Sequence, residues 1–300
     1  MKHWVRSNDE RLHFIPTDTL YIKIDKEAVL RSGMILPEEY KDTMPEYMVI
    51  SLGNRERLFR SDLMLLEMLA QTNWERPLYM SMTVGKDNYL GTLSDFFVQE
   101  GLAYRITPFN WKKLGYSYND GIDNIVVADT ERFYHNVMDR FKFGGLKENP
   151  DYYVDETIQR MILTHRRLLA SLAVQLYDEG QKEKALNILN RCEEELPVSL
   201  VAHEFFSGMD IGTTYMQLGE VEKASNTLTS LADEQVEYLK WYSSLGRKRL
   251  IQAGSDVYMR VRCLQNIIKA FETGGDAYKE FAAKYTDELD NIFNNLKLHI

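Results

Sequence analysis

The sequence has only two cysteines, Cys192 and Cys263, in 300 residues. Each falls at an apolar position of a helical pattern, and no CxxC spacing occurs, so a zinc site built from local cysteine pairs is excluded. We expect two buried free thiols, with a single disulfide as the alternative in an oxidising compartment.

Long apolar runs are also missing. The best stretch, residues 63–70, is interrupted by Glu67 and is far shorter than the roughly 18 residues that cross a bilayer. The charged segment 1–11 lacks the apolar core of a secretory signal. These features predict a soluble chain in the cytoplasm, unless Met1 lies inside a longer protein.

An excess of basic residues is absent as well. The net charge is −9, whereas nucleic-acid-binding domains carry a basic face, so we expect no nucleic-acid partner. The short basic groups are expected to lie on solvated surfaces; they comprise Arg55, Arg57, Arg60, Arg247, Lys248 and Arg249.

Local catalytic motifs are missing too. The sequence has no GxGxxG, GxxxxGK[ST], HExxH or GxSxG and no Asp-rich calcium loop. No two of its six histidines stand three or four residues apart on one helix. We therefore expect no metal, no cofactor and no enzymatic activity in this chain.

The first half of the sequence predicts a small mixed α/β domain over residues 1–150. Alternation predicts a strand at 19–24, followed by a loop-rich stretch that reaches Gly53. A helix capped by Ser61 is expected to run to Asn73. Further elements are expected as strands at 78–84 and 101–108 and as helices at 93–99 and 129–141.

The second half predicts an all-α tetratricopeptide-like domain over residues 151–300, which makes the whole chain α+β. Prolines nearly vanish after Pro150, and two copies of a small-residue template lie 39 residues apart. We expect at least five antiparallel helices over 157–296, with turns at two glycines and close helix contacts at two alanines. These residues are Gly180, Gly219, Ala185 and Ala224.

Two clusters of aromatic and polar residues near predicted strands are candidate binding sites for a sugar or polar peptide. The first contains Asn73, Trp74, Arg76, Tyr79, Asp87, Asn88 and Tyr89. The second contains Tyr104, Arg105, Trp111, Tyr116, Tyr118 and Asp120. The alternative is purely structural: a buried Trp74 with polar contacts that hold the loops, and ordinary packing at the end of a strand.

Several long strings resemble the soluble C-terminal region of a family of large bacterial multi-pass membrane proteins, described by a domain of unknown function and similar to integral-membrane protein O-mannosyltransferases. They are RSNDERLHFIPTDTLYIKIDKEAVL, TNWERPLYMSMTVG, DNYLG, EGLAYRITP and FKFGGL. The resemblance extends over nearly the whole chain. It implies a location on the periplasmic side of the membrane, attached through transmembrane helices that this sequence does not contain.

The resemblance therefore predicts an accessory, non-catalytic domain of a membrane glycosyltransferase. Such a domain would bind acceptor protein, glycan or a partner subunit, and it would meet the membrane only through the missing N-terminal region. The alternative is a self-standing tetratricopeptide adaptor that recruits a peptide partner.

Overall fold

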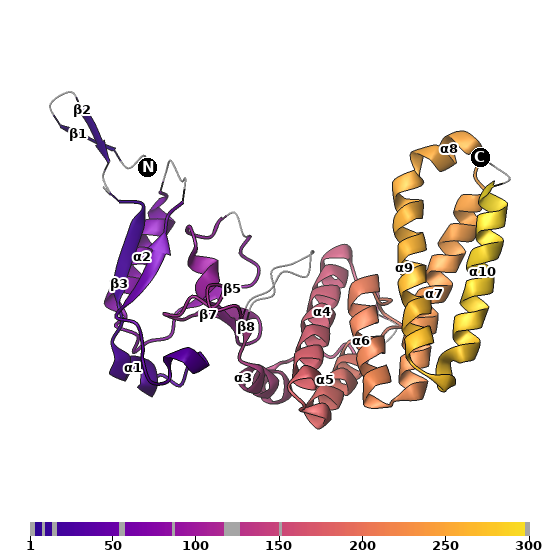
Figure 1. The fold of residues 1–300 in the computed structure, drawn as a ribbon, viewed down its shortest axis with the longest axis horizontal. Coiled ribbons are helices and arrows are strands. Elements are labelled where there is room, and N and C mark those ends of the chain that lie inside the picture. Colours follow the sequence, from indigo (N-terminus) through magenta and orange to yellow (C-terminus); the bar gives the residue numbers. More distant parts are fainter. Residues whose placement is uncertain are drawn as a thin grey trace. The chain divides into compact units, whose positions relative to one another are not determined.

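The computed structural model describes residues 4–7, 10–13, 17–53, 58–85, 88–116, 127–149 and 152–297. The chain forms two compact units, Met1–Asn136 and Val137–Ile300, here called the N-terminal unit and the helical unit (Figure 1). Small sheets lie in the first unit and long helices form the second, which confirms the α+β class.

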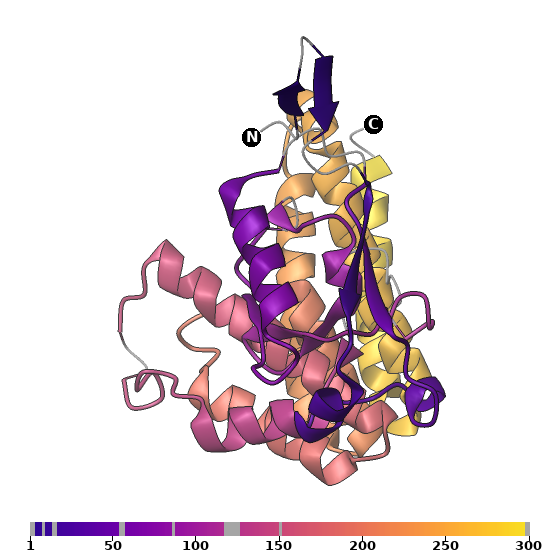
Figure 2. The same cartoon turned by 90° about the vertical axis from the view of Figure 1, so that its left-hand side faces the viewer.

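The N-terminal unit contains two antiparallel strand pairs. Strands β1 (Trp4–Ser7) and β2 (Glu10–His13) form one pair. Strands β3 (Thr19–Lys23) and β4 (Tyr47–Ser51) form the other, in which Ile22 faces Met48. One face of this second pair is buried beside helix α2 (Arg60–Gln71), and helix α1 (Lys26–Arg31) follows β3 (Figure 1; Figure 2).

A four-stranded sheet completes this unit, in the order β5-β7-β6-β8. Its strands are β5 (Tyr79–Ser81), β6 (Phe97–Gln99), β7 (Ala103–Ile106) and β8 (Val127–Ala128). Only the β6–β8 pairing is parallel. Short 3-10 helices occupy Glu38–Tyr40 and Leu93–Phe96, and helix α3 (Thr130–His135) continues as a π-helical turn, Asn136–Arg140.

Several local predictions for this unit were wrong. Strand β4 lies inside the stretch expected to be loop, and residues 97–99 form a strand where a helix was expected. The N-cap of helix α2 is Phe59, two residues before the expected Ser61. The backbone N–H of Phe59 donates to the Asp62 carboxylate at 2.8 Å, so Ser61 lies inside the helix. Strand pairing decided the first two cases, and pairing between distant segments is not visible in a local pattern.

The helical unit contains α4 (Glu156–Asp178), α5 (Lys182–Glu195), α6 (Phe205–Leu218), α7 (Val221–Ser243), α8 (Arg247–Gln252), α9 (Gly254–Thr273) and α10 (Lys279–Lys297). A 3-10 turn, Asp276–Tyr278, precedes α10. Helix α4 packs on α5 and α6, α6 on α7, and α7 on α9 and α10 (Figure 1). The expected set of helices over 157–296 is confirmed.

The small residues of the two template copies lie where the helices approach each other. Gly180 and Gly219 have φ angles of 80° and 82° in the turns after α4 and α6, a conformation that glycine adopts without steric cost. Ala185 and Ala224 are fully buried. A Cβ on Gly212 would lie 2.6 Å from the Leu228 side chain, so this side chain of α7 packs directly on the backbone of α6.

The long connection between α5 and α6 is held by a buried arginine of α4. Both Nη atoms of Arg166 donate at 3.0 Å to backbone carbonyls, those of Leu196, Val201 and Ala202. Its side chain is wholly buried, and this burial lowers the pKa of the guanidinium. Three carbonyl dipoles thus replace the water that a buried cation would lose.

The division between the units falls at Asn136–Val137, before the expected boundary at residues 150–151. The segment that follows α3 belongs with the helices because its side chains contact them. Lys147 Nζ lies 3.0 Å from a carboxylate oxygen of both Glu194 and Glu195, and the Phe143 ring packs edge-on against His165 of α4.

Both cysteines are free thiols. Cys192 is buried, and burial raises the pKa of its thiol to about 12, whereas Cys263 is only partly buried. The expectation of a buried thiol is therefore confirmed for Cys192 alone. In the part of the chain that the structure describes, no helix has the length and apolarity to cross a membrane.

Candidate functional site

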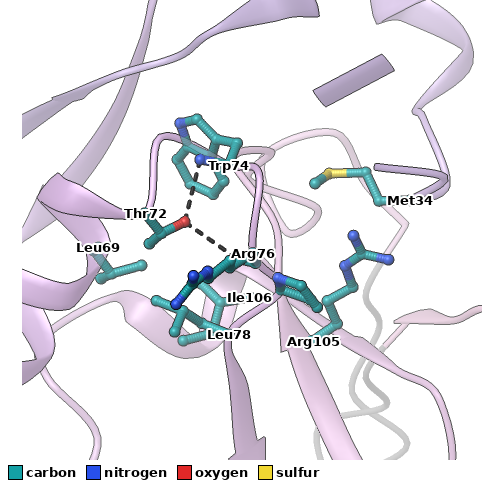
Figure 3. Close-up of a pocket in the computed structure, with 9 residues that line it drawn as sticks. Met34, Leu69, Thr72, Trp74, Arg76, Leu78, Arg105 and Ile106 are labelled. Carbon is teal, nitrogen blue, oxygen red and sulfur yellow. Dashed lines mark hydrogen bonds between the residues drawn. The ribbon is translucent and has the colours of Figure 1, made fainter. Parts of the chain in front are cut away.

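The turn that follows α2 has an unusual backbone. Asn73 and Trp74 have φ angles of 47° and 63°, a left-handed conformation that is uncommon for Asn and strained for a residue as bulky as Trp. Thr72 supports the turn, since its Oγ1 accepts from the Trp74 N–H and donates to the Arg76 carbonyl, both at 3.1 Å (Figure 3). Strain of this kind persists only where surrounding contacts hold it.

Two long-range hydrogen bonds hold this turn to the end of β3. The Trp74 indole Nε1 donates to the Lys23 carbonyl at 2.9 Å, and the Asn73 amide donates to Asp25 at 2.8 Å. The Ala28 backbone N–H and then the Asn73 amide lower the pKa of the Asp25 carboxyl. Trp74 is 5% exposed, so its indole is a packing element of the core and presents no open ring face to a ligand.

A buried group of charges lies beside this turn on the four-stranded sheet. Glu100 is approached by Arg105 Nη1 at 3.4 Å and by Arg132 Nη1 at 3.6 Å. Its second oxygen accepts from the Tyr79 hydroxyl at 2.6 Å, and burial together with that hydrogen bond raises the pKa of Tyr79. Arg132 also lies 3.5 Å from Asp129.

This group contains two cations and two carboxylates, so it is balanced in charge. Each carboxylate already lies beside an arginine, and the Glu100 backbone carbonyl accepts from Asn136 at 2.6 Å. The arrangement is that of a structural ion-pair network, which fixes α3 to the sheet and, through Arg132 Nη2 at 2.7 Å, to the Gly33 carbonyl.

Arg105 connects this network to a small cavity. It is 2% exposed, and its Nη2 donates to the Ser32 carbonyl at 3.1 Å. Its Nε is buried and has no hydrogen-bond partner among the described residues. The cavity joins the two clusters that the sequence separated, because Arg105 shares its wall with Trp74 and Arg76 (Figure 3). Its lining is Met34, Leu69, Thr72, Trp74, Arg76, Pro77, Leu78, Arg105 and Ile106.

The cavity is too small for a sugar. Its volume is about 10 Å³, close to the space that a single water needs, whereas ligand pockets are more than ten times larger. A water here would accept from the orphan Arg105 Nε–H and complete the hydrogen bonding of the buried guanidinium. The cavity therefore suits one water and offers no enclosed glycan site.

The other candidate residues are divided between packing and the surface. Trp111 is 3% exposed, and its indole donates to Thr107 Oγ1 at 2.8 Å. The ring of Tyr89 packs edge-on against Phe97, on which Tyr104 also stacks. Arg76, Asn88, Tyr79 and Tyr116 are exposed. Five residues singled out above fall outside the described residues: Arg55, Arg57, Asp87, Tyr118 and Asp120.

Sequence reasoning missed Glu100, Asp129 and Arg132, which carry the charge network. Each looks like an ordinary surface charge in the sequence, and the contacts of Arg132 with Glu100 and with the Gly33 carbonyl join segments far apart in the sequence. A glutamate directly before Gly101 was the only local hint, since such a position favours a tight turn at the end of a strand. No group of three metal-ligating side chains occurs among the described residues.

Comparison with known proteins adds one finding. A family model described as TMEM260-associated domain 2 matches residues 1–125. The match contains the Trp74 turn, the cavity and most of the four-stranded sheet, and it ends before the helical unit. It is consistent with an accessory domain of a membrane protein. No curated protein and no solved structure matches the chain.

Proposed function

We propose that the chain is a non-catalytic accessory domain of a membrane glycosyltransferase-like protein and binds acceptor protein, glycan or a partner subunit. The match of residues 1–125 to a TMEM260-associated domain carries this proposal. It agrees with the resemblance of the quoted strings to the soluble part of membrane proteins similar to protein O-mannosyltransferases. The domain then lies on the periplasmic side of the membrane.

The helical unit supplies the binding surface as a tetratricopeptide-like array. Its two helix pairs repeat the same buried alanine, Ala185 and Ala224, and the same turn glycine, Gly180 and Gly219. Helices stacked in this way bury a continuous core and leave one side of each pair free for a partner. Binding rather than chemistry fits the N-terminal unit as well, where arginines neutralise the buried carboxylates.

An antibody against the chain tests this proposal in fractionated cells of the source organism. The account expects the antigen in the membrane fraction at a mass well above the 35.1 kDa of this chain, because transmembrane helices would precede it. After permeabilisation of the outer membrane alone, added protease should digest the epitope, as expected for a periplasmic domain. An antigen of 35.1 kDa in the soluble fraction would contradict the account.

That contradicting result would favour the second candidate, a self-standing tetratricopeptide adaptor for a peptide partner. One observation favours it: the helical unit, where a peptide would bind, lies outside the matched residues 1–125. The same fractionation thus separates the two functions by the mass and location of one band.

A further inference from the structure

The corner formed by the end of α7, helix α8 and the start of α9 is positively charged, although the chain as a whole is negative. Residues 238–262 contain six cations and one carboxylate and carry a net charge of +5, whereas the whole chain carries −9. The cations are Lys240, Arg247, Lys248, Arg249, Arg260 and Arg262, and the carboxylate is Asp256. We call residues 238–262 the α8 corner.

Large apolar side chains are exposed at the same corner. Ile251 on α8 is 70% exposed, Tyr258 on α9 is 63% exposed, and Trp241 on α7 is 54% exposed. Helix α8 crosses the end of the bundle that α7, α9 and α10 form (Figure 1). Only Leu250 of α8 is buried, so the remaining side chains of this short helix face outward.

The frame that carries these side chains is held by contacts between α7 and α9. The Arg260 guanidinium lies 3.5 Å from the centre of the Tyr238 ring, and its Nη1 donates to Gln235 at 3.1 Å. Asp256 pairs with Arg260 at 3.1 Å and accepts from the Tyr242 hydroxyl. Asp256 is thereby neutralised, and Lys240 pairs with Glu288 of α10 at 2.8 Å. Arg247, Lys248 and Arg249 are exposed, as the sequence predicted, and supply the positive charge of the corner.

We propose that the α8 corner docks on an anionic phospholipid surface. Lysine and arginine are attracted to anionic lipid headgroups, and Trp and Tyr favour the headgroup region, where an aromatic ring and a polar tip both find partners. Exposed apolar residues beside cations are the combination that interfacial segments use. The corner is an outward-pointing end of a helix bundle, which fits a flat surface better than an extended acidic peptide, for which a groove is needed.

This inference goes beyond the proposed function, because it assigns a membrane-facing end to the helical unit whether or not the parent protein transfers sugar. A domain tethered to a membrane by other segments needs only weak additional binding to keep one orientation. Two weak attachments to the same surface act together through their high effective concentration.

Flotation with lipid vesicles tests the proposal on the purified full chain. Vesicles of phosphatidylcholine with about 30% phosphatidylglycerol should bind the chain at least roughly tenfold more strongly than phosphatidylcholine alone at low salt, because several cations near an anionic surface each add to the attraction. Replacing Arg247, Lys248 and Arg249 together by Gln should weaken this binding about 100-fold, since each cation near an anionic surface contributes roughly fivefold. Added salt should weaken it too.

A matched control removes the same charge elsewhere on the helical unit. Lys142, Lys182 and Lys269 are exposed, and their replacement by Gln should leave vesicle binding within about threefold, because screening limits the reach of a distant charge. Circular dichroism melts of both triple variants confirm that the helices remain folded.

Trp241 gives a local readout of contact with lipid. In a Trp4→Phe background, brominated phosphatidylcholine in the same anionic vesicles should quench part of the tryptophan fluorescence. Adding Trp241→Phe should abolish that quenching, since the two remaining tryptophans, Trp74 and Trp111, are buried. Equal binding to neutral and anionic vesicles, equal loss in both triple variants, or no binding at low salt would each overturn the proposal. Binding of a poly-glutamate peptide in place of vesicles would assign the corner to an acidic protein partner instead.

Discussion

Arg105 and Glu100 form an ion pair in which Nη1 lies 3.4 Å from Oε1 and the side chains are 2% and 5% exposed. A buried cation that loses its carboxylate is left uncompensated in a medium of low polarity. Glu100→Ala should therefore lower the free energy of unfolding by about 3–5 kcal/mol. Urea unfolding measures this change.

The matched control for this variant is the exposed pair of Glu27 and Arg31, 3.6 Å apart with side chains 86% and 65% exposed. Glu27→Ala should cost less than about 1 kcal/mol, because water screens such a pair. Similar losses in the two variants would show that Glu100 is not part of a buried network.

Trp74→Ala should lower the free energy of unfolding by about 3–5 kcal/mol, the range for removing a buried large aromatic side chain. The variant leaves a cavity, and it removes the indole N–H that donates a hydrogen bond to the Lys23 carbonyl. The control is Trp241→Ala, which should lower the free energy of unfolding by less than about 1 kcal/mol because Trp241 is exposed. Thermal melts of both variants and the parent measure the difference. If Trp74→Ala kept the parent's melting temperature but lost binding to glycan or acceptor protein, Trp74 would be a recognition residue.

Ala185→Leu and Ala224→Leu should each cost about 1–3 kcal/mol, because three added heavy atoms would overpack a fully buried helix contact. Ala283 on α10 is exposed, so Ala283→Leu adds the same atoms without overpacking and should stay within about 0.5 kcal/mol. Urea unfolding of the parent and the three variants measures these changes in the free energy of unfolding. Unchanged stability at both buried positions would mean that the small-residue template does not mark the helix contacts.

His203 should make the helical unit less stable in mild acid. It is 7% exposed, and burial, followed by the charge of Arg166, lowers its pKa from 6.5 to about 4. The neutral ring is favoured in the folded state, so its stability contribution is complete above pH 6.5 and is lost as the pH falls toward 4. The loss between pH 7 and pH 4.5 should be about 2 kcal/mol.

His203→Leu isolates this effect, because the variant cannot take up the proton. Its stability should fall by about 2 kcal/mol less than that of the parent over the same pH interval. Urea unfolding at pH 7 and pH 4.5 gives the free energy of unfolding of the parent and of the variant at each pH. Parallel losses in parent and variant would show that His203 is protonated in the folded state or is not buried.

The sequence predicted the helical unit better than the N-terminal unit for a physical reason. Helix formation and helix pairing leave local signals, such as Gly180 and Gly219 at turns and Ala185 and Ala224 at contacts, and these fall where the structure places them. Sheet pairing leaves weaker signals: β4 and β6 were missed because β3, the partner of β4, and β8, one partner of β6, lie far along the chain.

The candidate site shows the same limit. Trp74, Arg76 and Arg105 were singled out by residue type, but only the fold reveals that they line one cavity. Glu100 and Arg132 were missed because they look like ordinary charged residues in the sequence, and only the fold brings them together as an ion pair. The resemblance and the domain match were needed to connect any of this with a membrane protein.

The central claim, that the chain binds rather than catalyses within a larger membrane protein, can be measured directly. Membranes that contain the full-length protein are assayed for sugar transfer from a lipid-phosphate-sugar donor to acceptor protein, with and without the segment corresponding to residues 1–300. The account predicts that the purified chain alone transfers nothing, that its removal lowers transfer, and that its addition in trans restores part of it. Transfer by the purified chain, lost on changing one of its own residues, would contradict the account.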